Sequence, residues 1–422
     1  MSRALILSTT TGYQLRSFGD AAGRAGIDLV FGTDRCHQLD DPWRDAAIAV
    51  RFHEEDASLD AIAEAARTRP IDGVIAVGDR PVVLAARASQ MLGVRGTPPD
   101  AAAASVNKTR ARRAFAAAGL AVPWYFETPA AIDVATDPRT RYPCVVKPLG
   151  LSGSRGVIRA DTPAELERAL ARLRTLLRRK DVRAIRDGLD ETILVEGFIE
   201  GREFAIEGVM TAGVFQPFAL FDKPLPLDGP FFEETIYVTP SDLMALEQRS
   251  VMDSVARGAR ALGLINGPLH AECRVGPKGT FILEVAARPI GGLCSKVLRF
   301  AAEGRDEEVS LEEVLLRHAV GEDISRYARE SVAAGVMMIP IPRRGMLKRV
   351  HGIEAAAATP GIDDVRITAK IDQMLEPLPE ASSYLGFIFA RGSNSPAVVR
   401  ALEDAHARLQ FDIAAPIALT AG

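Results

Sequence analysis

Residues 267–292 read GPLHAECRVGPKGTFILEVAARPIGG, and this stretch carries the sharpest structural signal in the chain. The Gly-Pro-Lys-Gly segment in its middle predicts a tight turn, and the alternation of apolar and polar residues on both sides predicts two paired strands. Matching the apolar faces of the two strands gives three pairs: Val275 with Phe281, Cys273 with Leu283, and Ala271 with Val285. The same register places Glu272 directly opposite Glu284.

The two opposed carboxylates of this hairpin predict a metal site. Like charges that face each other across a strand pair are destabilising unless something neutralises them. A hard divalent cation would do so, and Mg²⁺ bound together with phosphate is the usual case. A solvated polar face that tolerates two acids is the alternative. Arg288 follows Glu284 where the strand leaves the sheet, and its guanidinium could clamp a phosphate or a carboxylate.

A second stretch, YPCVVKPLGLSGSRGV at residues 142–157, predicts a loop that binds phosphate. An apolar run ends at Lys147, and glycines interleaved with serines follow. Glycines let backbone N–H groups approach phosphate oxygens, and a lysine adds a point charge. The lysine precedes the glycines, so this is not a Walker A loop. An ordinary flexible hairpin is the alternative.

A third stretch, TILVEGFIEGREFAIE at residues 192–207, predicts a strand that ends near Glu196 and another that starts near Glu203. A carboxylate at such a strand end is a natural acceptor for an adenine amino group or for ribose hydroxyls. The alternative is that both acids lie on solvated loop positions.

The first hundred residues predict a doubly wound α/β sheet, because short apolar strands alternate with helices. The expected elements are a strand at 4–8, a helix to about 25, a strand at 27–31, a helix at 59–67, a strand at 73–77 and a helix at 81–92. The first strand–helix turn, Thr9–Gly12, has no GxGxxG pattern, so a scaffold domain is favoured over a dinucleotide site. Residues 93–100 predict a turn-rich linker, and residues 101–118 predict a new region that is helical in composition.

The last ninety residues predict a small domain with more strands than helices. The expected strands are 333–342, 346–353, 364–369 and 384–390, and an amphipathic helix is expected at 396–409.

Composition excludes several classes of protein. The 422 residues are 47% hydrophobic and 25% charged, which is ordinary for a globular chain of several domains. The 51 basic and 55 acidic residues give a net charge of −4, so nucleic acid is not an expected partner. No signal peptide or membrane span is evident, and the four cysteines form no CxxC pair. We therefore expect a cytoplasmic protein with free thiols and no membrane partner.

Together these stretches resemble the ATP-grasp superfamily, specifically the carboxylate–amine ligases that include the L-amino-acid (dipeptide) ligases. The resembling parts occur in matching order over about residues 100–300: Asn107-Lys108, Val145-Val146-Lys147-Pro148 with its loop, residues 195–203, His270-Ala-Glu272, and residues 284–292. The resemblance implies an α/β protein with the ATP-grasp fold. It implies a doubly wound, Rossmann-like pre-ATP-grasp domain at 1–100, an ATP-grasp domain at 101–325 with a lid subdomain at about 115–193, and a small β-rich α+β domain of the amino-acid-ligase type at 326–422.

The resemblance also implies roles for the matching positions. The ATP-binding residues would be Lys108, Lys147, Ser152, Gly153, Ser154, Gly156, Glu196, Phe198 and Glu203. Glu272 and Glu284 would be the ligands of Mg²⁺, which Mn²⁺ could replace. Lys147 and Arg288 would be catalytic, and His270, Arg288, Gly291 and Gly292 would line the substrate side. Many members place Asn two residues after the second metal carboxylate, whereas this chain has Ala286, which puts a second metal ion in doubt.

The region 215–239 would supply further pocket residues, among them Glu233 or Glu234 to hold an ammonium group; both could equally serve packing. The implied activity is ADP-forming ligation of a small-molecule carboxylate, an amino acid, to an amine through an acyl phosphate. By the same analogy, a homodimer is expected. The alternatives are a ligase of the purine-biosynthesis or carboxylase type, and a nucleotide-binding protein without turnover.

Overall fold

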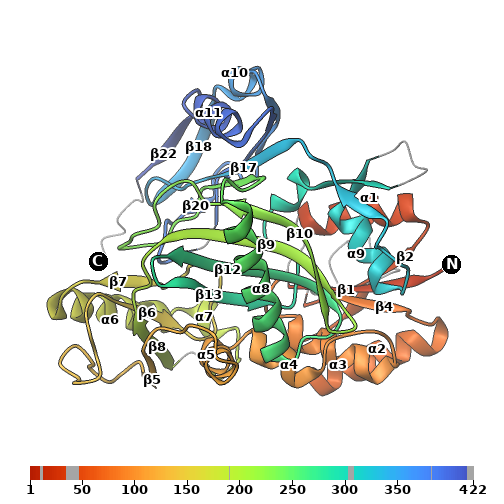
Figure 1. The fold of residues 1–422 in the computed structure, drawn as a ribbon, viewed down its shortest axis with the longest axis horizontal. Coiled ribbons are helices and arrows are strands. Elements are labelled where there is room, and N and C mark those ends of the chain that lie inside the picture. The colour runs from red at the N-terminus through yellow and green to blue at the C-terminus, as the bar shows by residue number, and fades with distance from the viewer. Residues whose placement is uncertain (10–12, 35–46, 190, 303–307, 382, 416–422) are drawn as a thin grey trace, which may run out of the picture. The chain divides into compact units, whose positions relative to one another are not determined.

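The computed structural model describes residues 1–9, 13–34, 47–189, 191–302, 308–381 and 383–415 (Figure 1). The chain forms two compact units. Unit 1 comprises residues 1–122, 204–220 and 243–330, and unit 2 comprises residues 123–203, 221–242 and 331–422. The domain boundaries expected near residues 100 and 325 stay predictions.

The beginning of unit 1 is the parallel sheet that the alternating pattern predicts. Its order is β3-β2-β1-β4, and its strands are β1 (Arg3–Ser8), β2 (Asp28–Thr33), β3 (Ala47–Ala49) and β4 (Gly73–Val77). Its helices are α1 (Tyr13–Ala25), α2 (Glu55–Thr68) and α3 (Val82–Leu92). Strand β1 is almost wholly buried, as expected for an apolar run inside a parallel sheet. The α/β fold class is therefore confirmed.

Two predictions from the sequence concern residues that lie, at least in part, outside the described ranges. The turn Thr9–Gly12 lies outside the described residues from position 10 onward, and Cys36 lies outside them as well. The remaining cysteines, Cys144, Cys273 and Cys294, are buried thiols that form no disulfide within the described ranges.

The region at 101–118, whose composition predicts helix, contains two helices in the structure. These are α4 (Pro99–Ser105) and α5 (Lys108–Ala117). Asn107 adopts an extended backbone between them, and its side-chain oxygen accepts a hydrogen bond of 3.0 Å from the amide of Arg110. Asparagine satisfies a free helix amide in this way, which makes it a helix start rather than a helix interior residue.

The remainder of unit 1 is built around the predicted hairpin. The strands run in the order β13-β12-β9-β10 and comprise β9 (Arg202–Thr211), β10 (Val214–Asp222), β12 (Gly267–Gly276) and β13 (Gly279–Ala286). Helix α8 (Ala245–Leu262) packs on β12 and β13 (Figure 1). The other elements are η1 (Cys294–Val297), β14 (Arg299–Ala302), β15 (Val309–Ser310), α9 (Leu311–Ala319) and β16 (Tyr327–Arg329).

The register of the hairpin is the predicted one next to the carboxylates. Ala271 lies opposite Val285, and Glu272 lies opposite Glu284. The side chains of Ala271 and Val285 are buried in the core beneath α8, so the apolar face fixes the register and the two acids follow from it.

Beyond the carboxylate pair the predicted register is wrong. A β-bulge shifts the pairing by one residue, so that neither Cys273 with Leu283 nor Val275 with Phe281 is a pair. Ile282 lies opposite Cys273 instead and enters the core, with a side chain that is 2% exposed. Strict alternation assumes one residue per position on each strand, and a bulge adds one that the pattern does not reveal.

Unit 2 begins with a four-stranded antiparallel sheet of order β5-β8-β6-β7. Its strands are β5 (Tyr125–Pro129), β6 (Cys144–Pro148), β7 (Ile158–Ala160) and β8 (Thr192–Gly197), and its helices are α6 (Pro163–Leu177) and α7 (Lys180–Arg183). Leucines of α6 and the apolar residues of β6 and β8 form one core. The loop between β6 and β7 is the predicted phosphate loop.

The four strands and the helix predicted after residue 332 are confirmed, with bounds that differ by a few residues. One sheet contains β11 (Ile236–Thr239), β17 (Ala333–Ile339), β21 (Gly386–Gly392) and β19 (Ile362–Ile367) in that order. A second contains β20 (Met374–Leu375), β18 (Gly345–His351) and β22 (Gln410–Ala414), and the helices are α10 (Ile353–Ala357) and α11 (Ser395–His406). Among the helices in the described part of the chain, none is long and apolar enough to span a membrane.

Candidate active site

The centre of the candidate site in unit 1 is the carboxylate pair of the hairpin. Glu272 on β12 and Glu284 on β13 occupy directly opposed positions. Burial raises the pKa of Glu284, and the negative charge of Asp79 raises it further. The positive charges of Arg288 and Lys108 act in the opposite direction. Two facing carboxylates of this kind are the donor set that a hard divalent cation prefers.

Arg288 is held by a partner that the sequence did not indicate. Its Nε donates to Oδ1 of Asp79 at 2.7 Å and its Nη2 to Oδ2 at 3.3 Å, while Nη1 donates to the carbonyl of Pro289 at 3.1 Å. Its Nη2 also lies 3.8 Å from a carboxylate oxygen of Glu284. Burial alone would lower the pKa of Arg288, but the neighbouring carboxylates raise it. The guanidinium is therefore a fixed positive charge beside the carboxylate pair.

Asp79 follows β4, at the end of a parallel strand, where ligand-contacting residues of such sheets are found. Its position after a predicted strand was the available signal. Lys108 is the first residue of α5, which the side chain of Asn107 caps. Unit 1 thus brings together Asp79, Lys108, Glu284 and Arg288.

His270 is buried behind the carboxylate pair. Its Nδ1 lies 3.1 Å from Oε2 of Glu207, and its Nε2 lies 3.7 Å from Oε1 of Glu272. Burial alone would lower the pKa of His270, but the hydrogen bond with Glu207 and the nearby carboxylate of Glu272 raise it to about 9. The amide of Ile290 donates to both oxygens of Glu207 at 3.1 Å. Glu207 thus fixes the imidazole next to a proposed metal ligand, an arrangement common around metal sites.

Two other predicted positions follow Ile290. A Cβ built on Gly291 would meet no atom within 4 Å, so open space adjoins this residue, whereas Gly292 has a φ of +64° that favours glycine. Ala286 lies opposite His270 at the end of β13 and is fully buried. Its methyl group offers no ligand atom for a second ion.

In unit 2, Lys147 and Glu196 form an ion pair. The Nζ of Lys147 on β6 lies 2.5 Å from Oε1 of Glu196 on β8, and the two side chains are 14% and 2% exposed. Phe198, just after β8, lies beneath the guanidinium of Arg159 at 4.0 Å, and its amide donates to the carbonyl of Pro143 at 3.1 Å. The predicted adenine-binding residues therefore come from neighbouring strands.

The phosphate loop contains the backbone geometry that its glycines predict. Gly153 and Gly156 have φ angles of +62° and +74°, and Ser154 has +56°. Two turns close the loop, with the amide of Arg155 donating to Ser152 and that of Val157 donating to Ser154. Such turns aim successive amides toward one side, which is the arrangement that binds anions.

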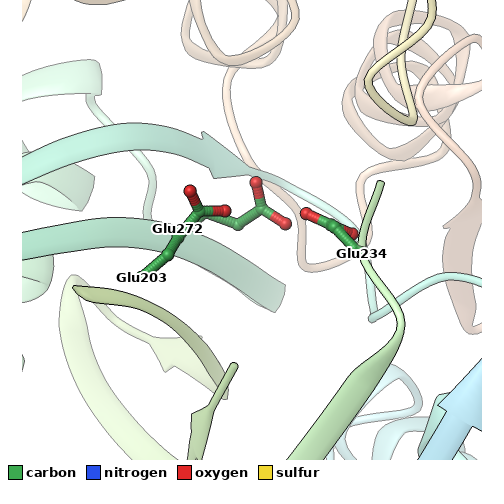
Figure 2. Close-up of side chains that lie close together, drawn as sticks. All are labelled: Glu203, Glu234 and Glu272. Carbon is green, nitrogen blue, oxygen red and sulfur yellow. The ribbon is translucent and has the colours of Figure 1, made fainter. Parts of the chain in front are cut away.

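A buried lysine of unit 2 was missed by the sequence analysis. The Nζ of Lys223, the residue after β10, lies 2.8 Å from Oε1 of Glu203 and 2.5 Å from Oε1 of Glu234. The hydroxyl of Tyr237 donates to Glu234 at 2.8 Å. Figure 2 shows the side chains of Glu203 and Glu234. Only the acids stood out in the sequence, because a lysine at a strand end is ordinarily solvated.

The two candidate acids of the substrate side therefore differ. Glu234 is bonded to Lys223 and Tyr237, whereas Glu233 takes no part in that network. Burial raises the pKa of Glu233. The substrate role predicted for Glu233 stays a prediction.

Three family models match the chain in consecutive order. They are an ATP-grasp N-terminal domain at residues 19–95, an ATP-grasp domain at residues 140–297 and an L-amino acid ligase C-terminal domain 2 at residues 337–414.

Individual proteins are similar to this chain at low identity. The protein y4rH of Sinorhizobium fredii is 25% identical over 410 residues, which cover 96% of this chain and 82% of that protein. An alanine–anticapsin ligase of Bacillus subtilis is 26% identical over 258 residues, and the match spans 52% of that ligase. The crystal structure of an L-amino acid ligase from Bacillus licheniformis has a TM-score of 0.84 at 24% identity, covering 98% of this chain and 99% of the other. The fold is therefore shared over nearly the whole length.

Proposed function

Because the chain is an ATP-grasp protein that resembles L-amino acid ligases, we propose that it uses ATP to join a small-molecule carboxylate to an amine, releasing ADP. We propose that the carboxylate belongs to an amino acid. The observation that carries the proposal is the pair Glu272 and Glu284 with Arg288 beside it. Two carboxylates that could bind a cation and a guanidinium that could donate to phosphate or carboxylate thus lie together in unit 1.

Glu272 and Glu284 would hold Mg²⁺, and Mn²⁺ could replace it as a similar hard cation. When bound, the cation would offset the negative charge of the terminal phosphates of ATP. The donor set fits this role, since two carboxylates face each other on adjacent strands. Ala286 supplies no ligand, so a second ion would depend on oxygens of ATP itself.

The ATP-binding residues would divide by chemistry. Lys147, held by Glu196, would contact phosphate oxygens, as would Lys108. The amides at Ser152, Gly153, Ser154 and Gly156 would cover the phosphates, and Glu196, Phe198 and Glu203 would contact the adenine and ribose.

Positioning of the substrates and electrostatic stabilisation of the transferred phosphate would account for the rate of the ligation reaction. The substrate carboxylate would attack the γ-phosphate, and the amine would then attack the acyl phosphate. Arg288, oriented by Asp79, would stabilise the negative charge that moves between these groups. His270, Gly291, Gly292 and Glu233 would line the substrate side. No side-chain nucleophile is required for this chemistry.

The test is a matrix of amino-acid pairs incubated with the protein and MgATP. Phosphate release is scored for each pair, and product masses are then determined. We expect one ADP and one phosphate per amide bond, with labelled carboxylate oxygen transferred to the phosphate. AMP and pyrophosphate as stoichiometric products would contradict the proposal.

Variants connect the reaction to the proposed site. Glu272→Ala should lower turnover roughly 100-fold or more, because it removes electrostatic stabilisation of the phosphates. The matched control is Glu64→Gln, which changes an exposed carboxylate paired with Arg67 and should leave turnover unchanged. ATP binding without turnover on any pair would favour a nucleotide-binding protein, and turnover on a phosphorylated ribose amine would favour the purine-biosynthesis type.

A further inference from the structure

The phosphate loop of unit 2 is attached to a segment more than two hundred residues away in the chain. The amide of Gly156 donates to the carbonyl of Pro379 at 2.9 Å. The Nε of Arg155 donates to the carbonyl of Glu380 at 2.7 Å. Two consecutive residues at the end of the loop are thus bonded to two consecutive residues of the C-terminal part of unit 2.

The same segment is bound to helix α6 and to the residue just before α7. Arg172 on α6 makes a bidentate ion pair with Glu380, at 2.5 Å from Nε to Oε1 and 2.8 Å from Nη2 to Oε2. Arg179, which precedes α7, pairs with Glu376 at 2.5 Å. Bidentate arginine–carboxylate pairs have a fixed geometry, and Glu380 is only 25% exposed. These contacts should therefore stabilise the folded arrangement more than an ordinary surface ion pair does.

Residues 376–380, which we term the strap, have the sequence Glu-Pro-Leu-Pro-Glu. The two prolines restrict the backbone, so the strap presents its carbonyls with little conformational freedom. Pro379 is buried, and one glutamate lies at each end of the strap. A stiff segment with an anchor at both ends is suited to holding another loop in place.

The contacts leave the tip of the phosphate loop available. Gly156 and Arg155 are attached to the strap, whereas no residue of the described structure accepts a hydrogen bond from the amides of Gly153 or Ser154. These tip amides are the ones that the positive φ angles orient. Fixing one end of the loop while its tip stays open preorganises the tip amides for an anion.

We propose that the strap holds the phosphate loop in its nucleotide-binding conformation, with Glu380 as a positioning residue that acts through Arg172. This inference rests on the proposed function, because it takes the phosphates of ATP as the ligand of the loop. The C-terminal part of unit 2 thereby contributes to nucleotide affinity without contacting the nucleotide. The loop opens for exchange of ADP against ATP when the strap contacts break.

The test is a charge exchange between the two partners. We prepare Arg172→Glu, Glu380→Arg and the double variant, and measure the dissociation rate of a fluorescent ATP analogue by stopped flow. Hydrogen exchange of residues 150–157 is measured in the nucleotide-free protein. Each single variant should speed both processes roughly three- to tenfold, and the double variant should return both to within about twofold of the unaltered protein.

Controls separate the strap from general effects on unit 2. Lys348→Glu breaks an exposed pair with Asp372 in the same unit and should change neither measurement. Glu380→Gln keeps the size of the side chain and covers the case in which charge reversal prevents folding; it should act in the same direction as Glu380→Arg.

Three outcomes would overturn the inference: single variants that behave like Lys348→Glu, single variants that bind nucleotide more tightly, and a double variant that restores neither measurement. If the unaltered protein bound no ATP analogue, the proposed function would fail. Hydrogen exchange in the nucleotide-free protein would still decide whether the strap holds the loop.

Discussion

Asp79 and Arg288 are 209 residues apart in the chain and meet in a pair of hydrogen bonds. The motif that contains Arg288 could be read from sequence, and so could the acids Glu272 and Glu284. Their partners could not, because Asp79 follows a strand of another sheet and Lys223 resembles any lysine at a strand end. Hydrogen-bond partners of this kind depend on tertiary packing, which no local pattern encodes.

At the scale of single residues, we predict that Asp79→Asn lowers kcat while leaving ATP affinity unchanged. The amide keeps the shape of the side chain but loses the charge that orients the guanidinium of Arg288. Hydrogen bonds between charged groups contribute about 1.5–3 kcal/mol, which corresponds to a rate loss of roughly 10- to 100-fold. Steady-state kinetics and calorimetric ATP binding measure the two effects.

The matched control for Asp79→Asn is Asp56→Asn, which breaks an exposed pair with Arg87 in the same part of unit 1. It should leave both kcat and ATP affinity unaltered. Equal kcat for Asp79→Asn and the unaltered protein would show that Arg288 needs no positioning partner.

At the scale of elements, the hairpin β12–β13 shows what periodicity predicts and where it fails. Hydrophobic alternation predicted both strands, their turn and the opposition of Glu272 and Glu284. It failed at the bulge next to them, because one extra residue on a strand leaves no mark in composition. Composition predicted a helical region at 101–118 but did not locate the break between α4 and α5 at Asn107, since the surrounding alanines and arginines all favour helix.

The opposed acids Glu272 and Glu284 of the hairpin should lower the stability of the folded chain although activity requires them. Glu284→Gln should raise the free energy of unfolding by about 0.2–1 kcal/mol in EDTA, because it removes one of two facing charges. The same variant should lower turnover roughly 100-fold. Thermal and urea unfolding measure the first effect, and the phosphate-release assay measures the second.

Glu64→Gln serves as the control for stability, since its carboxylate faces Arg67 rather than another acid. This variant should not gain stability. A Glu284→Gln protein that is less stable than the unaltered chain would show that the carboxylate is already neutralised within the protein.

At the scale of the whole molecule, ligand binding should raise the free energy of unfolding. We predict that MgATP at 100 times its dissociation constant stabilises the folded state by about 2.7 kcal/mol, because only the folded chain binds it. Thermal unfolding with ATP and Mg²⁺ measures this, and replacing Mg²⁺ by EDTA should remove most of the gain. Equal stabilisation in EDTA would argue against a metal at Glu272 and Glu284. The expected homodimer stays a prediction.

The interleaving of the two units in sequence has a consequence for biosynthesis. Unit 1 contains residues 204–220 and 243–330 in addition to its first segment, and the last segment of unit 2 is residues 331–422. Neither unit can therefore be completed while only its first segment has left the ribosome, and pairing of distant segments delays folding. Arg172 on α6 and Arg179, which precedes α7, emerge long before Glu380 and Glu376, their partners in the strap. For that part of translation, the nascent chain carries Arg172 while Glu380, its bidentate partner, has yet to be made.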